Sequence, residues 1–318
     1  MNILVTGAVG FIGFHLANRL CKNKQNIIYG IDNFSKYYSF RLKKIRLKIL
    51  KANKNFKFIK MDISNYSKIK NFFMKKKINI LYHLAAQPGV IYSYKNPNSY
   101  TKNNILATSN ILKCLQLNRC WSKFIFASSS SVYGEKKKYP ILESSKLKPI
   151  NYYAKTKEIC ERMILNSKID KKKIFIFRFF TVYGPLSRPD MFISKYMRNL
   201  KYSLKTNLYH YGKHFRDFTF VNDVVSIMIR SILLPYNAKK RVFNICASKP
   251  IQMLRLVSII NSKLKLQSQL ALLPRRRGEI LKTYGSNSLL KKVFKFKKFT
   301  DINNGLNKTI LFFKKYNY

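Results

Sequence analysis

Three glycines near the start of the chain constrain its fold more than any other feature. They stand in the run Gly7-Ala-Val-Gly10-Phe-Ile-Gly13, between an apolar, β-branched segment at 2–6 and a segment at 11–21 with helical spacing of its apolar positions. Glycine at such a strand-to-helix turn lets the backbone turn tightly, approach a phosphate closely and pack helix against strand. The run therefore predicts a phosphate-binding turn in a sheet of parallel strands.

Apolar runs and amphipathic segments alternate along more than half of the chain. The apolar runs predict strands and the segments between them predict helices. Because strand and helix alternate, we expect an α/β fold: a Rossmann-type doubly wound parallel sheet with right-handed crossovers. The predicted strands are 2–6, 26–31, 56–61, 78–84, 123–127 and 174–179, and the predicted helices are 11–21, 41–51, 100–117 and 153–166.

Beyond Pro185 the alternation becomes irregular. Helical segments at 192–200, 223–234, 254–264 and 302–315 are separated by short strands. We expect a dinucleotide-binding domain at residues 1–180, to which part of the later chain returns, and a smaller α/β substrate-binding lobe at 181–318. A ligand is expected in the cleft between them.

Asp32 closes the second predicted strand, 19 residues after Gly13. A carboxylate at this point can accept hydrogen bonds from both hydroxyls of an adenosine ribose, and it repels a 2′-phosphate. The glycine run and Asp32 together favour NAD over NADP as the cofactor. The alternative is a set of turn glycines followed by an aspartate that caps a helix.

The chain of 318 residues carries 63 Lys and Arg against 12 Asp and Glu, a net charge of +51. Such an excess can neutralise nucleic-acid phosphates. The basic residues are spread along the whole chain, however, and they accompany many Asn, Ile, Phe and Tyr, the residues of AT-rich codons. We interpret the charge as a solvated surface that follows mutational bias, and we expect no specific nucleic-acid partner.

No membrane anchor and no metal site are expected. The apolar run 224–234 is interrupted by Arg230, and no run reaches the roughly 20 residues that span a bilayer. Residues 1–5 lack the basic flank and cleavage site of a secretory signal. The five cysteines and four histidines do not have the spacing of a metal site or a redox pair. These features predict a cytoplasmic protein without a metal.

Tyr153 and Lys157 lie one helical turn apart on one face of a predicted helix. Tyrosine has an ordinary pKa of about 10, so it becomes a useful base at neutral pH only when a nearby cation favours the phenolate. By itself such a pair is more typical of a helix surface. The serine run Ser128–Ser131 ends a predicted strand upstream, at the edge of the sheet where ligands bind. Together with the glycine run, it favours a catalytic pair.

With these motifs the chain resembles the extended short-chain dehydrogenase/reductase family, which includes NAD-dependent epimerases and dehydratases. The spacing Gly-x-x-Gly-x-x-Gly carries the resemblance, together with Asp62-Ile63 after the third strand and His83-Leu-Ala-Ala86 after the fourth. In the family these last two segments hold the adenine ring and border the NAD phosphates. The implied cofactor residues are Gly7, Gly10, Phe11, Ile12, Gly13, Asp32, Asn33, Asp62, Ile63, Leu84, Ala85, Ala86, Tyr153 and Lys157.

The resemblance also implies a catalytic set of Tyr153, Lys157 and Ser129. In the family, the hydroxyl residue aligned with Ser129 hydrogen-bonds the reacting sugar oxygen. Tyr153 is then expected to take the C4 hydroxyl proton while hydride passes from C4 to NAD, and to return the proton after the 4-keto sugar has turned over. Related dehydratases and decarboxylases carry acidic residues where this chain has Ser130 and Ser131. The chemistry is therefore expected to stop at epimerisation.

Most of the chain resembles the UDP-glucuronate 4-epimerases, above all in segments 32–38, 83–87 and 178–191. There the residues matching Thr181 and Arg188 lie by the sugar carboxylate, where a hydroxyl and a guanidinium suit an anion. UDP-glucose 4-epimerases typically have Asn at the position of Thr181. The alternative for Arg188 is a solvated loop cation. The implied substrate residues are Gln87, Ser129, Ser130, Thr181, Arg188, Arg216 and Arg276, the last two as contacts of the UDP pyrophosphate.

One departure bears on the substrate. Glucuronate epimerases usually read Gly-Val-Arg-Tyr-Ser where this chain has Ile91 in place of the arginine. The expected reaction is conversion of UDP-glucuronate to UDP-galacturonate, by a homodimer that pairs through helices 100–117 and 153–166. The alternatives are a UDP-glucose or UDP-N-acetylglucosamine 4-epimerase and, more remotely, a non-catalytic NAD-binding protein with RNA affinity.

Overall fold

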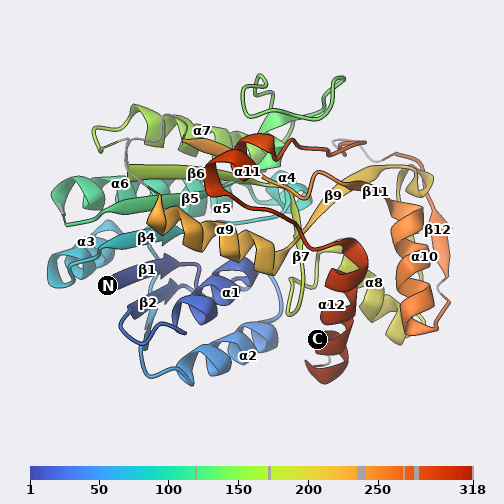
Figure 1. Cartoon of the computed structure of the whole chain (residues 1–318), viewed down its shortest axis with the longest axis horizontal. Helices are drawn as coiled ribbons and strands as arrows, with labels where there is room; N and C mark the ends of the chain where they lie inside the picture. Colours follow the sequence, from blue (N-terminus) through green and yellow to red (C-terminus); the bar gives the residue numbers. More distant parts are fainter. Residues whose placement is uncertain (119, 171–172, 235–240, 268, 276–278, 317–318) are drawn as a thin grey trace.

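Seven parallel strands form the central sheet of the protein (Figure 1). Their order is β10-β6-β5-β4-β1-β2-β3, so the chain starts in the middle of the sheet and winds outward in both directions. The computed structural model describes residues 1–118, 120–170, 173–234, 241–267, 269–275 and 279–316. The sheet strands are β1 (Asn2–Thr6), β2 (Ile27–Asp32), β3 (Phe56–Lys60), β4 (Ile80–His83), β5 (Lys123–Ser129), β6 (Ile174–Phe179) and β10 (Val242–Ile245).

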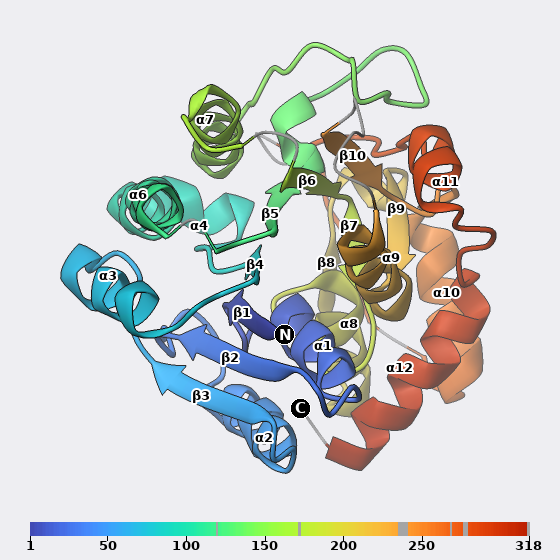
Figure 2. The same cartoon turned by 60° about the vertical axis from the view of Figure 1, so that its left-hand side comes forward.

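Helices cover both faces of this sheet because its strands are apolar on both sides. In β1, Ile3 and Val5 belong to one buried cluster and Leu4 to another. The first cluster is covered by α1 (Phe11–Leu20), α2 (Phe40–Lys51), α9 (Val221–Leu233) and α11 (Ser288–Phe294). The second is covered by α3 (Tyr66–Lys75), α6 (Ala107–Leu117) and α7 (Tyr152–Asn166), and the two layers are separated in Figure 2. The predicted doubly wound α/β class is confirmed.

The later chain builds a third buried cluster of its own and also returns to the central sheet. A three-stranded sheet, β11-β9-β7, and a two-stranded sheet, β12-β8, carry the third cluster together with three helices. Strand β10 belongs to the seven-stranded central sheet, and helices α9 and α11 pack on that sheet. The division of the chain into two parts at residue 180 remains our proposal. The elements are β7 (Thr181–Tyr183), α8 (Phe192–Lys201), β8 (Thr206–Leu208), β9 (Phe215–Phe220), β11 (Pro250–Gln252), α10 (Met253–Leu264), β12 (Leu270–Leu272) and α12 (Ile302–Tyr316).

The helix predicted at 100–117 is helical over this range, but its first part is not an α-helix. The structure has α4 (Val90–Lys95), then α5 (Pro97–Tyr100), a π-helical turn at Thr101–Leu106 and α6. The wider turn contains Asn104, which is buried and binds two other segments. Such π-helical turns are common at functional sites.

Two helices of the sheet layers were not predicted from the sequence. Helix α3 buries only Ile69, Phe72 and Phe73 among exposed lysines, so its apolar face is short. Helix α11 spans seven residues, too few for a clear helical period. None of the helices in the described ranges has the length and apolarity needed to cross a membrane.

The aromatic packing on β6 provides a test of the core. Phe177 is fully buried, and its ring centroid lies 6.2 Å from that of Phe243 and 5.7 Å from that of Phe294. Replacing Phe177 by alanine is expected to lower the free energy of unfolding by about 3–5 kcal/mol, since the ring leaves a cavity. Urea unfolding measures the change. Leu311→Ala, at a side chain that is 66% exposed, is the control and is expected to shift it by no more than about 0.5 kcal/mol.

Candidate active site

The glycine turn lies at the carboxyl end of β1, where backbone atoms of two loops meet. Gly7 has φ +71°, and a Cβ atom there would lie 2.8 Å from the backbone nitrogen of Ala85. A Cβ on Gly13 would lie 2.1 Å from the carbonyl oxygen of Gly7. Helix α1 begins directly after Gly10, which contributes no side-chain cap to its first N–H groups. The turn therefore offers bare backbone and a helix N-terminus to an anion.

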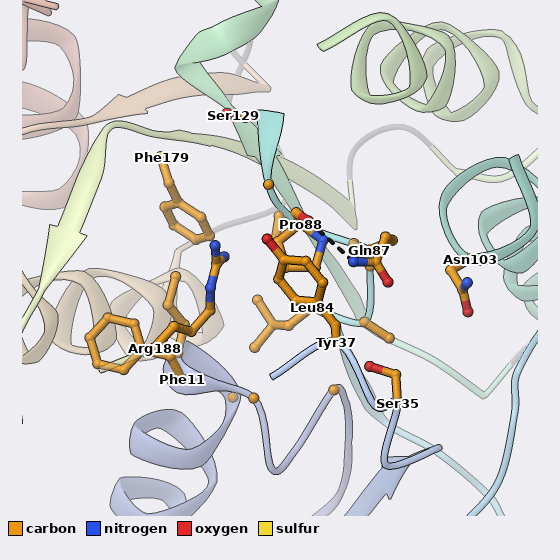
Figure 3. A pocket seen from close by; sticks show the side chains of 18 of the residues that line it. Phe11, Ser35, Tyr37, Leu84, Gln87, Pro88, Asn103, Ser129, Phe179 and Arg188 are labelled. Carbon is orange, nitrogen blue, oxygen red and sulfur yellow. Dashed lines mark hydrogen bonds between the residues drawn. The ribbon is translucent and has the colours of Figure 1, made fainter. Parts of the chain in front are cut away.

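A pocket of about 430 Å³ opens beside this turn, along the carboxyl ends of the central strands (Figure 3). It brings together side chains that lie far apart in the sequence, as expected for a doubly wound sheet. All of the predicted cofactor residues line it: Gly7, Gly10, Phe11, Ile12, Gly13, Asp32, Asn33, Asp62, Ile63, Leu84, Ala85, Ala86, Tyr153 and Lys157. Their contacts with a cofactor remain predictions.

Asp32 is held at the end of β2 by two backbone N–H groups. Its Oδ1 accepts from Phe34 at 2.8 Å and its Oδ2 accepts from Val9, inside the glycine turn, at 3.2 Å. Burial raises the pKa of Asp32, and these two hydrogen bonds oppose the rise. A carboxylate has about four lone-pair positions, so two are left for ribose hydroxyls.

The loop after β4 is fixed by buried polar side chains. The ring of His83 lies 2.8 Å from the hydroxyl of Thr6 and 3.1 Å from that of Thr108. Asn104, in the π-helical turn, accepts a hydrogen bond from the backbone of Gln87 at 2.7 Å and donates one to Thr156 on α7 at 2.9 Å. Asn104 thereby ties the pocket loop to the helix that carries Tyr153 and Lys157.

Tyr153 and Lys157 stand in the first two turns of α7 and both line the pocket. The ammonium of Lys157 donates to the carbonyl of Ala127 at 2.7 Å, and burial lowers its pKa to about 8. Burial raises the pKa of Tyr153, while the Ser129 hydroxyl and the Arg188 charge act in the opposite direction. Two polar groups thus favour the phenolate in an otherwise apolar environment.

Ser129 ends β5, and its side chain is engaged with its neighbours. Its Oγ lies 2.6 Å from the Oγ of Ser131 and accepts from the Ser131 N–H at 3.2 Å. Ser130 opens the short 3₁₀ turn Ser130–Tyr133 and lines the pocket, as do Gln87 and Thr181. The pocket is therefore lined by five of the predicted substrate residues: Gln87, Ser129, Ser130, Thr181 and Arg188.

Of the two predicted pyrophosphate contacts, Arg216 is described by the structure and is not among the residues that line this pocket. Arg216, on β9, lies 3.7 Å from Glu279 and donates to the carbonyl of Phe215 at 2.9 Å. Burial lowers its pKa to about 10. Arg276 lies outside the described residues. The role of both arginines stays a prediction.

Several residues that line the pocket were not predicted. Tyr37 stands beside Arg188 in Figure 3, and the guanidinium carbon lies 5.9 Å from the centre of the tyrosine ring. Lys43, from α2, donates to the carbonyl of Ser35 at 2.6 Å. The paired tyrosines after Asp32 were the available signal. The sequence does not show which way these tyrosine side chains point, because a loop has no repeating pattern of buried and exposed positions.

A metal would need a cluster of carboxylates, imidazoles or thiolates. The described residues contain no group of three or more His, Cys, Asp and Glu side chains close enough to hold a metal ion.

The site combines a backbone cradle for phosphate, a carboxylate for ribose, and a Ser–Tyr–Lys group. The sheet and these features together define an NAD-dependent enzyme of the Rossmann type that handles protons and hydride.

Comparison with known proteins gives the family. The chain belongs to the NAD-dependent epimerase/dehydratase family, whose model matches residues 3–246. It is 30% identical to a probable UDP-glucuronate 4-epimerase of Rhizobium meliloti, over 96% of this chain and 95% of the relative. It is 32% identical to UDP-glucuronate 4-epimerase 2 of Arabidopsis thaliana, over 99% of this chain and 76% of the relative.

A solved structure agrees with these relatives. The UDP-glucuronic acid 4-epimerase of Bacillus cereus, in complex with UDP-glucuronic acid and NAD, superposes with a TM-score of 0.90 at 31% identity, and the match covers 99% of each chain. The predicted family and the NAD cofactor are confirmed.

Gly13→Ala tests the backbone cradle. The new methyl group would meet the Gly7 carbonyl, so the turn must open, and the protein is expected to lose bound NAD. The NAD content of the purified protein, measured by absorbance after denaturation, reports the loss. Arg19→Ala, at an exposed position in the last turn of the same helix, is the control, and equal NAD content in Gly13→Ala and the wild type would contradict the prediction.

Two histidines predict how stability depends on pH. Burial lowers the pKa of His15 from 6.5 to about 4 and that of His83 from 6.5 to about 3. Between pH 6.5 and 4 the unfolded chain therefore binds protons that the folded chain does not, and the free energy of unfolding is expected to fall as the pH falls through this window. Urea unfolding at pH 7, 6 and 5 should show a smaller fall in the free energy of unfolding for His15→Gln than for the wild type. If this free energy depends on pH equally in both proteins, His15 does not contribute as proposed.

Proposed function

We propose that this protein is an NAD-dependent 4-epimerase that converts UDP-glucuronate to UDP-galacturonate through a 4-keto sugar. The observation that carries the proposal is the meeting of Tyr153, Lys157, Ser129 and Arg188 in one pocket beside the glycine cradle. The named relatives and the Bacillus cereus complex support it. A Ser–Tyr–Lys group supplies the acid and base, and Arg188 suits an anionic sugar.

Each residue of the Ser–Tyr–Lys group has its own role in the proposed reaction. Bound NAD supplies reversible acceptance of the C4 hydride. Tyr153 accepts the proton of the C4 hydroxyl and later returns it to the same oxygen, when the hydride is added back to the opposite face of C4, so no net proton is consumed. Ser129 orients the reacting oxygen, and Lys157 adds a positive charge held in place by Ala127. Because the side chains of Ser130 and Ser131 are not acids, nothing at this position assists an elimination.

The residues around the pocket fit NAD at three points. Gly7 and Gly13 allow the backbone to approach a pyrophosphate, and Asp32 keeps lone pairs for a ribose. Asp62 and Ile63 also line the pocket, and we propose that they border the adenine ring of NAD. This placement supports the proposed contacts of the individual residues with NAD.

A 4-epimerase of UDP-glucose or UDP-N-acetylglucosamine is the second candidate. It is favoured by one feature, the pairing of Arg188 with Asp190, which offsets the positive charge of Arg188. The remote candidate, a non-catalytic protein with RNA affinity, has only the net charge of +51 in its favour. We propose that no specific nucleic acid binds.

Assembly and location are further parts of the proposal. We propose a homodimer that pairs through α6, α7 and the turn before α6, where Leu106 is 45% and Leu117 56% exposed. We also propose a cytoplasmic site of action, since the described cysteines are all free thiols. Sedimentation velocity tests the dimer.

Tyr153→Phe tests the proposed mechanism. Without the phenolic oxygen, kcat is expected to fall by about a hundredfold to ten-thousandfold, because the acid and base is lost. NMR of the sugar nucleotides formed from UDP-glucuronate measures the conversion. Tyr152→Phe is the matched control: the hydroxyl of Tyr152 lies 2.7 Å from Thr101, outside the lining of the pocket, so its loss is expected to change kcat by less than about twofold.

A further inference from the structure

Arg188 does not enter the pocket as a free cation. Its Nε donates to Oδ1 of Asp190 at 3.0 Å and its Nη2 donates to Oδ2 at 2.6 Å, a two-point contact that fixes the plane of the guanidinium. The side chains are 20% and 33% exposed, so water screens the pair only in part. Burial acts to raise the pKa of Asp190, but the hydrogen bonds and charge of Arg188 outweigh it and hold that pKa below its ordinary value, so the carboxylate is charged at neutral pH.

Tyr37 adds a third member to this cluster. Its hydroxyl donates to Oδ2 of Asp190 at 3.1 Å, although Tyr37 comes from the loop after β2 and Asp190 from the loop after β7. Figure 3 places Tyr37 and Arg188 side by side in the pocket. The carboxylate of Asp190 is thus engaged from two sides, and its negative charge stays next to Arg188.

The position of Arg188 relates this pair to the sugar. Arg188 and Tyr153 line the same pocket, and the charge of Arg188 acts against the larger effect of burial, which raises the pKa of the phenol. In a hexose the carbon C6 is two bonds from C4, so a group near the base at C4 is also near the substituent on C5. Among the charged side chains that line the described pocket (Asp32, Lys43, Asp62, Lys157 and Arg188), Arg188 is the only arginine.

We propose that Asp190 is a specificity-determining residue that neutralises Arg188 and thereby lets the pocket accept neutral as well as anionic UDP-hexoses. This inference rests on the proposed function only for the identity of the sugar nucleotide. A carboxylate at C6 is attracted by Arg188 and repelled by Asp190, whereas a hydroxymethyl group responds to neither charge. Asp190 therefore lowers the preference for the anionic sugar, in addition to orienting the guanidinium.

The experiment compares Asp190→Asn with the wild type by binding. The asparagine keeps the size and one oxygen for Arg188 but removes the negative charge. The ratio of the dissociation constants for UDP-glucose and UDP-glucuronate, measured by calorimetry on the NAD-loaded protein, is expected to rise about fivefold to tenfold in favour of UDP-glucuronate. The affinity for UDP itself, which lacks the sugar, is expected to change by less than about twofold.

Controls separate charge from folding. Asp170→Asn removes the same charge from a carboxylate that lies 3.9 Å from Lys173, away from the pocket, and is expected to leave the ratio unchanged. Asp190→Ser serves as a second variant if the first does not fold, and thermal unfolding and NAD content verify both. An unchanged ratio, or a ratio that falls because Arg188 loses its orientation, would overturn the proposal.

Binding also separates this inference from the proposed function. If the wild type binds both sugar nucleotides but epimerises neither, the proposed function fails, while the shift in the ratio still supports the role of Asp190. If the wild type epimerises UDP-glucuronate and Asp190→Asn shows no shift, the role of Asp190 fails alone.

Discussion

The close approach of backbone to backbone at the glycine turn is the contact on which the rest of the site depends. Gly7 lies against the backbone of Ala85, and Gly13 lies against the carbonyl of Gly7, at distances that leave no space for a side chain. This contact joins β1, α1 and the loop after β4 into one surface. Asp32 fastens the same turn to β2 through the N–H of Val9. The cofactor cradle is therefore held by contacts within the chain itself, and a turn held in this way reduces the ordering that binding requires.

The catalytic helix is positioned by a second, buried set of contacts. Glu161 on α7 lies 2.6 Å from Arg178 on β6, with only 2% and 6% of the two side chains exposed, and Ser128 donates to the same carboxylate. A buried pair of this kind adds little net stability because desolvation offsets the attraction, but removing one partner costs about 3–5 kcal/mol. Its effect is to fix the register of α7 against β5. Tyr153 and Ser129 then face one pocket.

The sequence predicted the sheet better than the helices around it. The strands at 2–6 and 174–179 match β1 and β6, because short runs rich in β-branched and aromatic residues indicate buried strands. The helix predicted at 100–117 begins with a π-helical turn that the sequence did not predict, since the contacts of Asn104 in this turn are with Gln87 and Thr156, which are distant in the sequence. Helix α3 has too few apolar residues to be recognised among its lysines.

The amino-acid sequence by itself determined the class of fold, the glycine cradle, Asp32, and the helical spacing of Tyr153 and Lys157, because each of these depends on residues close together in the chain. Only the tertiary structure decided which loops share the pocket. It placed Tyr37 and Asp190 on Arg188, and it left Arg216 beside Glu279 rather than on the lining of the pocket. The physical reason is that charge pairing acts through space: whether an arginine is free or neutralised depends on loops that have no periodic pattern to read.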